Sequence, residues 1–269
     1  MSAPSNNVVA SLLVYSQAKE ALAQVKADPH VLNFFCLGKH TVWRYKTIYD
    51  KEPDTIAWLS RIPEGEVLWD IGANVGLYTI YAGVTRKARV LAFEPLASNY
   101  YVLNMNIELN KLGDRVHAFC LAFSDETACG VLNASSSAPG AAGCSFNEAI
   151  DDHGKTFVPS FTQGMMGFTM DEFIKKYKPD FPNHLKIDVD GLESRIVNGA
   201  SKTLRDPRLK TISIELDANR PDYVEDVLAK IQAAGFTFTG KNRSKVIAPN
   251  SSINNYQFVR AEASAEAAE

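Results

Sequence analysis

Residues 67–76 read VLWDIGANVG, and this stretch decides the fold. A short apolar run ends in Asp70, and glycines follow at positions 72 and 76, so the segment predicts a buried strand that turns directly into a helix. Glycine suits such a turn because it adopts positive φ angles and lets a ligand approach the backbone. A dinucleotide-binding turn would read GxGxxG and hold a pyrophosphate at the helix N-terminus. The pattern here is DxGxxxG, which argues against a nicotinamide-dependent dehydrogenase.

A second acidic residue follows the next expected strand. That strand, residues 90–93, leads to Glu94, which lies 22 residues after Gly72. An acidic residue at about this offset accepts hydrogen bonds from a ribose diol. Asp70 would repel a pyrophosphate but would suit a ligand that carries an amino group. Together the two residues predict a positively charged nucleoside cofactor without phosphates, which is S-adenosylmethionine.

Strands and helices alternate on both sides of this turn. We expect strands at 67–69, 90–93, 116–123, 185–189, 211–216, 236–239 and 255–260. We expect helices after Gly76, at 97–111, from a capping box at Thr169–Glu172 to about residue 177, and from Pro221 to about residue 234. This order predicts an α/β fold, with a mostly parallel sheet, helices on both faces and an antiparallel hairpin of the last two strands.

The remaining segments predict the domain organisation. Residues 1–60 read as an extension with an amphipathic helix at 6–27, a hairpin within 31–48 broken at Gly38-Lys39, and a helix from Pro53. Residues 61–260 form the main domain. Within it, residues 133–168 are rich in Ser, Ala and Gly and are expected to be a functional loop or flap. The tail, residues 261–269, is expected to be disordered.

Acidic residues end four of the expected strands: Asp70, Glu94, Asp188 and Glu215. Ligands of open parallel sheets bind at the carboxyl ends of the strands, so we expect these four side chains at one edge of the sheet.

Lys186, Asp188 and Asp190 alternate along one strand and therefore share a face. Two interpretations stay open. Lys186 forms an ion pair with a neighbouring acidic residue, or Asp188 is a general base near the reacting group and Lys186 tunes it. His153 and His184 are alternative bases. Acidic residues at the ends of two strands, Asp188 with Glu215 and Asp217, could also bind Mg²⁺ and a diol, although our main prediction contains no metal.

Five segments resemble a known family: WDIGANVGLYT (69–79), FEP (93–95), LAFSDE (121–126), LKIDVDGLE (185–193) and IEL (214–216). They are similar to the FkbM-type S-adenosylmethionine-dependent methyltransferases, over about residues 50–216. The resemblance implies a class I methyltransferase (Rossmann-like) fold, whose seven-stranded sheet has a reversed last hairpin, and O-methylation of sugars or polyketide-type products. In one departure, Asp190 stands where the family pattern KIDVEG has a glutamate.

The resemblance also implies roles for single residues. Asp70, Gly72, Asn74 and Gly76 would hold the methionine part of the cofactor, Glu94 the ribose, and Ser124 and Asp125 would lie near the adenine. Asn99 and Glu52 are further candidates for the site.

Composition excludes other classes of function. The 269 residues include 28 Lys+Arg and 31 Asp+Glu, a net charge of −3 that argues against a basic nucleic-acid footprint. No apolar run approaches the roughly 18 residues needed to cross a bilayer. The N-terminus lacks the positive charge of a signal peptide, and the four cysteines have no disulfide or zinc spacing. We expect a cytoplasmic protein.

The main hypothesis is therefore an O-methyltransferase that acts on a hydroxyl of a sugar, glycolipid or natural-product alcohol. Its partner would be a small-molecule or carbohydrate acceptor and not nucleic acid, and no segment would span a membrane. The alternatives are a methyltransferase-like scaffold without turnover and a metal-assisted enzyme acting on a diol. A nucleic-acid methyltransferase is disfavoured because no NPPY-type motif is present.

Overall fold

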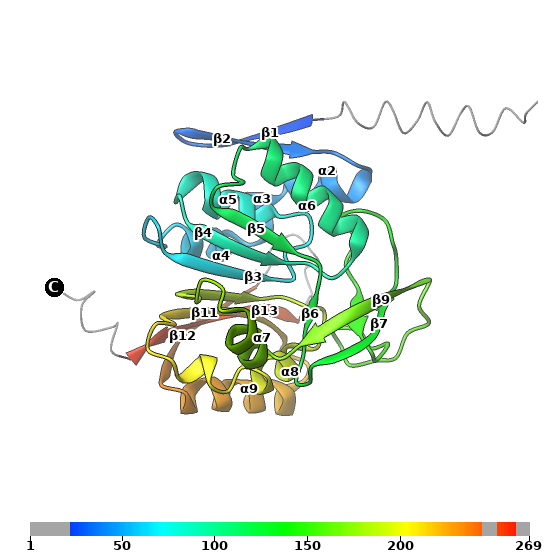
Figure 1. The fold of residues 1–269 in the computed structure, drawn as a ribbon, viewed down its shortest axis with the longest axis vertical. Helices are drawn as coiled ribbons and strands as arrows, with labels where there is room; N and C mark the ends of the chain where they lie inside the picture. The colour runs from blue at the N-terminus through cyan, green and yellow to red at the C-terminus, as the bar shows by residue number, and fades with distance from the viewer. Residues whose placement is uncertain (1–21, 244–251, 262–269) are drawn as a thin grey trace, which may run out of the picture.

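The computed structural model describes residues 22–243 and 252–261. Its centre is a seven-stranded sheet in the order β12-β13-β11-β10-β3-β4-β5 (Figure 1). The strands, in this order, are Phe236–Arg243, Ile253–Arg260, Thr211–Asp217, His184–Ile187, Val67–Ile71, Arg89–Phe93 and Val116–Phe119. Strands β11, β10, β3, β4 and β5 pair in parallel, whereas β13 is antiparallel to both of its neighbours. The mostly parallel sheet with a reversed last hairpin is confirmed.

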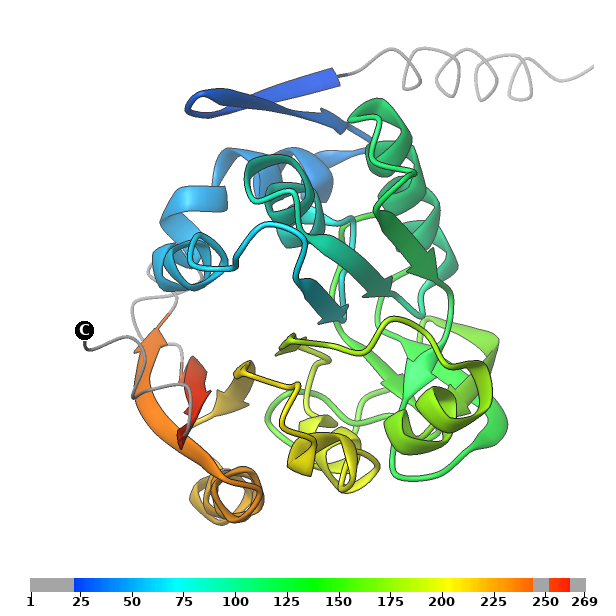
Figure 2. The same ribbon diagram turned by 60° about the vertical axis from the view of Figure 1, so that its left-hand side comes forward.

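Helices cover both faces of this sheet (Figures 1 and 2). One face carries α4 (Pro53–Leu59), α5 (Leu77–Thr85) and α6 (Ala97–Leu109); the other carries α7 (Met170–Tyr177), α8 (Glu193–Asn198) and α9 (Pro221–Ala233), with a 3-10 turn at Thr203–Arg205. Each layer encloses its own buried apolar cluster. Because both faces are covered, the central strands are buried throughout, as their apolar sequences predict.

The expected capping box before α7 is confirmed. The Thr169 hydroxyl accepts a hydrogen bond from the backbone N–H of Glu172 at 3.1 Å. This bond satisfies one of the free N–H groups at the helix start, and Asp171 and Glu172 place negative charge in its first turn.

The helix expected from Pro53 is confirmed as α4, but two other N-terminal expectations are wrong where the structure describes them. Residues 22–27, expected as the end of a helix, form strand β1 (Leu22–Ala27), which pairs antiparallel with β2 (His30–Phe35); residues 6–21 lie outside the described part. The expected second arm of a hairpin after Gly38 is instead α2 (Lys39–Lys46), followed by α3 (Ile48–Lys51). The helix wins because it lets Tyr45 stack on Phe34 at 4.3 Å between ring centroids. Aromatic and β-branched residues in 41–45 had suggested a strand, and tertiary packing overrides that propensity.

The expectations for residues 116–168 also need correction. The predicted third strand divides after Phe119, and its end, β6 (Ala122–Phe123), joins a second sheet of order β6-β9-β7-β8. The other strands are β7 (Ala128–Ala134), β8 (Cys144–Phe146) and β9 (Phe161–Phe168). Much of the expected flap is thus packed antiparallel sheet, because Phe146 and Met165 bury a small apolar core against Leu132.

Two expectations are not tested by these residues. Most of the expected disordered tail, residues 262–269, lies outside the described part, and the boundary near residue 60 stays a prediction. Within the described residues, every helix is too short or too polar to cross a membrane.

Candidate active site

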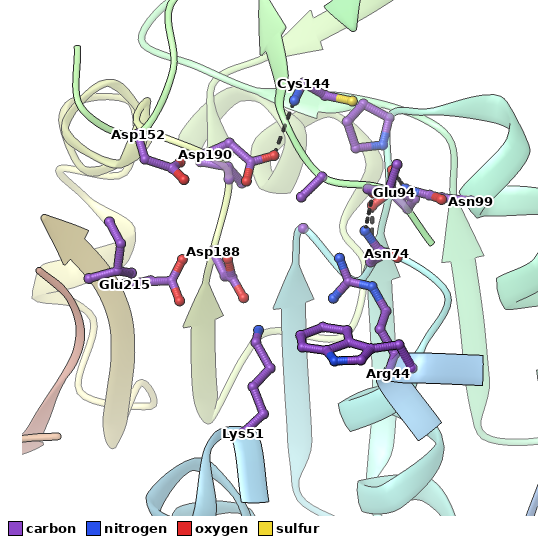
Figure 3. A pocket seen from close by; sticks show the side chains of 17 residues that line it. Arg44, Lys51, Asn74, Glu94, Asn99, Cys144, Asp152, Asp188, Asp190 and Glu215 are labelled. Atoms are coloured by element: carbon purple, nitrogen blue, oxygen red, sulfur yellow. Dashed lines mark hydrogen bonds between the residues drawn. The ribbon is translucent and has the colours of Figure 1, made fainter. Parts of the chain in front are cut away.

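A cavity of about 300 Å³ lies at the carboxyl ends of β3, β4, β10 and β11 (Figure 3). The helices α2 and α3 border it on one side, and the second sheet and its loops on another. Its charged lining residues are Arg44, Lys51, Glu94, Asp152, Asp188, Asp190 and Glu215. The location is the one expected for a ligand site in an open parallel sheet.

The two glycines of the turn after β3 are required by close packing. Gly72 has φ +80°, and a Cβ added to it would lie 1.7 Å from the carbonyl oxygen of Asp188. Gly76 has φ +83° and immediately precedes α5, and a Cβ there would lie 2.5 Å from Cδ1 of Leu103. Side chains other than hydrogen are strained at such angles, and at Gly72 a Cβ would also collide with backbone that cannot move aside. The turn therefore brings bare backbone to the edge of the cavity.

Glu94 is anchored beside this turn. Its Oε2 accepts from the backbone N–H of Asn74 at 2.7 Å, and its Oε1 accepts from the N–H of Leu96 at 2.9 Å and from the side-chain amide of Asn99 at 3.4 Å. Burial raises the pKa of Glu94 to about 7, although these hydrogen bonds oppose the shift. Glu94, Asn74 and Asn99 line the cavity together with Gly72, so the structure brings together four of the predicted cofactor residues.

Asp70 lies behind the cavity instead of in its lining. Its side chain is buried, accepts a hydrogen bond from the Thr79 hydroxyl at 2.6 Å, and lies 3.8 Å from the ammonium of Lys186. Burial raises the pKa of Asp70, and Lys186 opposes that rise. We predicted four carboxylates at this edge of the sheet, but only those of Glu94, Asp188 and Glu215 line the cavity. Asp70 instead lies beneath the cavity, next to the ammonium group of Lys186.

Ser124 and Asp125 are likewise outside the lining of the cavity. The Ser124 hydroxyl donates to Asp125 at 3.1 Å, and Asp125 forms an ion pair with Arg195 at 3.5 Å. Their place near an adenine stays a prediction. A small apolar void of about 30 Å³ adjoins the main cavity and is bordered by Phe93, Ala122 and Phe146 among others. It extends the site toward β6.

The ion pair expected along β10 is confirmed. The ammonium of Lys186 lies 2.8 Å from Oδ2 of Asp188, and the lysine side chain is 2% exposed. Burial alone would raise the pKa of Asp188, but the ammonium groups of Lys186 and Lys51 hold it well below its ordinary range. Asp188 is therefore a carboxylate at any working pH. Its role as a general base stays a prediction.

The alternative bases lie elsewhere. His184 begins β10, at the edge of the sheet opposite the cavity, where its ring nitrogens lie 2.7 Å from the Thr211 hydroxyl and 2.6 Å from a Glu66 carboxylate oxygen. The hypothesis that His184 is the base is wrong. Nδ1 of His153 lies 2.7 Å from the carboxylate of Asp217, and neither residue lines the cavity. Asp217 therefore does not join Asp188 and Glu215 in the cavity, where the three were predicted to bind Mg²⁺.

A different group of three carboxylates converges. Oxygen atoms of Glu52, Asp188 and Glu215 all lie within 4.8 Å of one another. Burial and the nearby charge of Asp188 raise the pKa of Glu215 well above its ordinary value. Figure 3 shows Asp188 and Glu215 on neighbouring strands, facing Lys51 from α3.

Several lining residues escaped sequence reasoning. Lys51 precedes the start of α4 and resembles an ordinary solvated lysine, yet its side chain is 9% exposed. Asp152 comes from the segment between β8 and β9; burial, followed by the charge of Asp190, raises its pKa to about 8. Arg44 donates from Nε to the carbonyl of Gly140 at 2.7 Å. No local spacing marks these positions, because α2, α3 and the second sheet reach the cavity only through the tertiary fold.

Comparison with known proteins agrees with this geometry. A family described as the methyltransferase FkbM domain matches residues 70–238. The chain belongs to the FkbM methyltransferase family. It therefore has the class I methyltransferase fold and is a methyltransferase whose cofactor is S-adenosylmethionine, as the sequence predicts.

The individual relatives are similar to this chain at low sequence identity. Methyltransferase sdnD of Sordaria araneosa is 26% identical over 195 residues, which cover 64% of this chain and 73% of that protein. Hexuronic acid methyltransferase AglP of Haloferax volcanii is 22% identical over 186 residues, covering 68% of this chain and 70% of the relative. Among solved structures, the tRNA m1G37 methyltransferase of M. jannaschii superposes with a TM-score of 0.48 and 13% identity, over 89% of this chain and 56% of that one.

Proposed function

We propose that this FkbM methyltransferase transfers the methyl group of S-adenosylmethionine to a hydroxyl of a sugar or a related alcohol. One observation carries the proposal. A single cavity is bordered at one end by the glycine turn and Glu94, and at the other by Asp188, Asp152 and Glu215. A nucleoside-binding end and an acidic end thus share one space, which is what a two-substrate transfer needs.

The residues present fit the cofactor. Glu94 has accepted three hydrogen bonds from the protein, and its carboxylate still lines the cavity, where it can accept another from a ribose hydroxyl. Asn74 and Asn99 border the same end, and the apolar void beside Phe93 offers a surface for an adenine. Asp188 and Asp190 favour a ligand with a positive charge. S-adenosylmethionine supplies a methyl group on a cationic sulfur.

Asp188 is the proposed acceptor of the hydroxyl proton. In the reaction the acceptor oxygen bonds to the methyl carbon, the carbon–sulfur bond breaks with its electron pair left on sulfur, and the hydroxyl proton passes to the carboxylate. Asp188 is a weak base because Lys186 and Lys51 stabilise its ionised form. A weak base suffices here, since the hydroxyl becomes strongly acidic as its oxygen bonds to carbon. Lys186 positions the carboxylate and touches neither substrate.

Two features support a sugar as the acceptor. Trp43 lines the cavity and is 40% exposed, so it offers an aromatic face to a ligand. Arg44, Asp152 and Glu215 add donors and acceptors around it, and such a combination suits a molecule that carries several hydroxyls. One relative is named for methylating hexuronic acid, and its likeness to this chain favours the same class of acceptor.

The experiment has two stages. Thermal unfolding is measured with S-adenosylmethionine and with S-adenosylhomocysteine, and we expect both to raise the Tm. A labelled-methyl transfer screen then covers neutral sugars, hexuronic acids, glycolipids and polyketide alcohols, with matched amino sugars as controls. Transfer to an alcohol supports the proposal. Cofactor binding without transfer to any acceptor favours the scaffold alternative, and no cofactor binding contradicts the proposal outright.

A further inference from the structure

The carboxylates of Glu52, Asp188 and Glu215 create a demand for positive charge at the acidic end of the cavity. Their oxygen atoms lie within 4.8 Å of one another, and the three residues come from three different elements or junctions. Such an all-oxygen set suits a hard divalent cation. Carboxylates this close to one another in a partly buried site repel strongly unless a proton or a cation lies between them.

Lys51 already supplies a cation at this place. Its ammonium nitrogen lies 2.5 Å from Oε1 of Glu52, and its side chain lines the cavity and points toward Asp188 (Figure 3). Burial alone would lower the pKa of Lys51, but Glu52 and Glu215 raise it above the ordinary value. The lysine therefore carries its charge, and it is paired with Glu52 and points toward the other two carboxylates from the side of α3.

The ammonium group of Lys51 also has N–H donors available for a further hydrogen bond. It carries three N–H donors, and among the described residues its one ion pair within 4.0 Å is with Glu52. Because the group borders the cavity, a remaining donor is available to a ligand. An oxygen acceptor can receive that hydrogen bond, whereas a protonated amine is repelled.

We propose that Lys51 is the resident cation of the Glu52–Asp188–Glu215 cluster, in place of a divalent metal, and that its ammonium group binds the oxygen of the methyl acceptor. The second half rests on the proposed function. In this role Lys51 stabilises the negative charge that develops on the acceptor oxygen, which is the work a metal ion does when it binds a diol. The enzyme then needs no added metal.

The first half is tested with Mn²⁺ alone, without cofactor or acceptor. Lys51→Met removes the charge and keeps the length of the side chain, so the three carboxylates should recruit a cation. By calorimetry or electron paramagnetic resonance, we expect Lys51→Met to bind one Mn²⁺ at least tenfold more tightly than the wild type. Lys51→Arg and the exposed control Lys46→Met should behave like the wild type. Adding Glu215→Gln to Lys51→Met should abolish the new site.

Equal Mn²⁺ binding by Lys51→Met and the wild type would overturn the assignment. Circular dichroism shows whether Lys51→Met is folded. If it is not, the wild type and Glu215→Gln are compared directly. We then expect no difference in Mn²⁺ binding, and a site in the wild type that Glu215→Gln removes would contradict the proposal.

The second half is tested with the alcohol that the labelled-methyl screen returns. We expect Lys51→Met to lower kcat/KM about 100-fold, Mn²⁺ to restore part of this loss, and a chelator to leave the wild type unaffected. Unchanged kcat/KM would remove Lys51 from the acceptor. A screen without transfer contradicts the proposed function and with it this second half, while the Mn²⁺ result still decides whether Lys51 is the resident cation.

Discussion

A Cβ atom on Gly72 would lie 1.7 Å from the carbonyl oxygen of Asp188, so the turn after β3 is in direct backbone contact with the end of β10. Both residues border the cavity. Gly72 belongs to its cofactor end and Asp188 to its acidic end. The relative position of the two ends is therefore set by main chain, and a change at Gly72 should disturb Asp188 directly.

Gly72→Ala tests this contact. The new Cβ meets backbone that cannot rotate away, and φ is +80°, so we expect a loss of unfolding free energy of about 2 kcal/mol or more and weaker cofactor binding. Urea denaturation and calorimetry with S-adenosylhomocysteine measure the two effects. Gly113→Ala is the matched control, because a Cβ there meets no atom within 4 Å among the described residues. Equal stability of the two variants would show that the turn can relax.

Glu94→Gln tests the carboxylate beside the turn. We expect cofactor affinity to fall about tenfold, since the ribose and the Asn74 N–H lose a charged acceptor. In the wild type the affinity should rise as pH passes through about 7, where Glu94 ionises. The variant should lack this rise. Calorimetry between pH 5.5 and 8.5 measures both. The exposed Glu108→Gln serves as control, and a variant that keeps the wild-type affinity and pH profile would remove Glu94 from the cofactor site.

The ionisation of Glu94 should also make the stability of the protein depend on pH. The pKa of Glu94 is raised from 4.5 to about 7 by burial, so between these values the folded protein binds more protons than the unfolded chain. Glu94 therefore favours folding at low pH, and this contribution, up to about 3 kcal/mol, is lost as pH rises through about 7. Glu94→Gln should flatten this part of the curve of unfolding free energy against pH. An identical slope in the variant would contradict the shift.

Lys186→Met tests the charge beneath the cavity. The substitution leaves Asp70 and Asp188 without the ammonium that lies 3.8 Å and 2.8 Å from them. Removing one partner of a buried ion pair costs about 3–5 kcal/mol, so we expect a loss of unfolding free energy of this size. Guanidinium denaturation measures it. The exposed Lys176→Met should change stability by less than about 0.5 kcal/mol. A similarly small effect at Lys186 would show that protonation of Asp70 compensates for the lost charge.

The cofactor turn could be predicted from sequence because its signal is local. Gly72 and Gly76 are needed for positive φ and close packing, and Glu94 follows at a fixed offset on the adjacent strand. The predicted ion pair of Lys186 rests on equally local logic, since a charged residue within a buried strand requires a partner. Both predictions depend only on the alternation of side chains along one strand or on the geometry of one turn.

The acidic end could be predicted only in part because its residues meet through the tertiary fold. Lys51 and Asp152 look like surface residues in sequence, and they reach the cavity from α3 and from the segment between β8 and β9. Asp70 shows the converse. Its position at a strand end suggested an exposed carboxylate, but its side chain points below the cavity, where Thr79 and Lys186 hold it. Strand position predicts the edge of the sheet, and side-chain direction then decides which residues a ligand can reach.

Asp188→Asn tests whether Asp188 acts in catalysis and not in cofactor binding. The amide keeps the shape of the side chain and can still receive a hydrogen bond from Lys186, so the affinity for S-adenosylhomocysteine should change less than threefold. It cannot take up a proton, and we expect kcat with the alcohol found in the screen to fall by about 100-fold or more, within the range that general bases contribute. Asp114→Asn is the control, because Asp114 is exposed and paired with Arg115 away from the cavity. If Asp188→Asn retains the wild-type kcat, the proton passes to another carboxyl of the cavity, and Asp152, with its pKa of about 8, is then the group to replace.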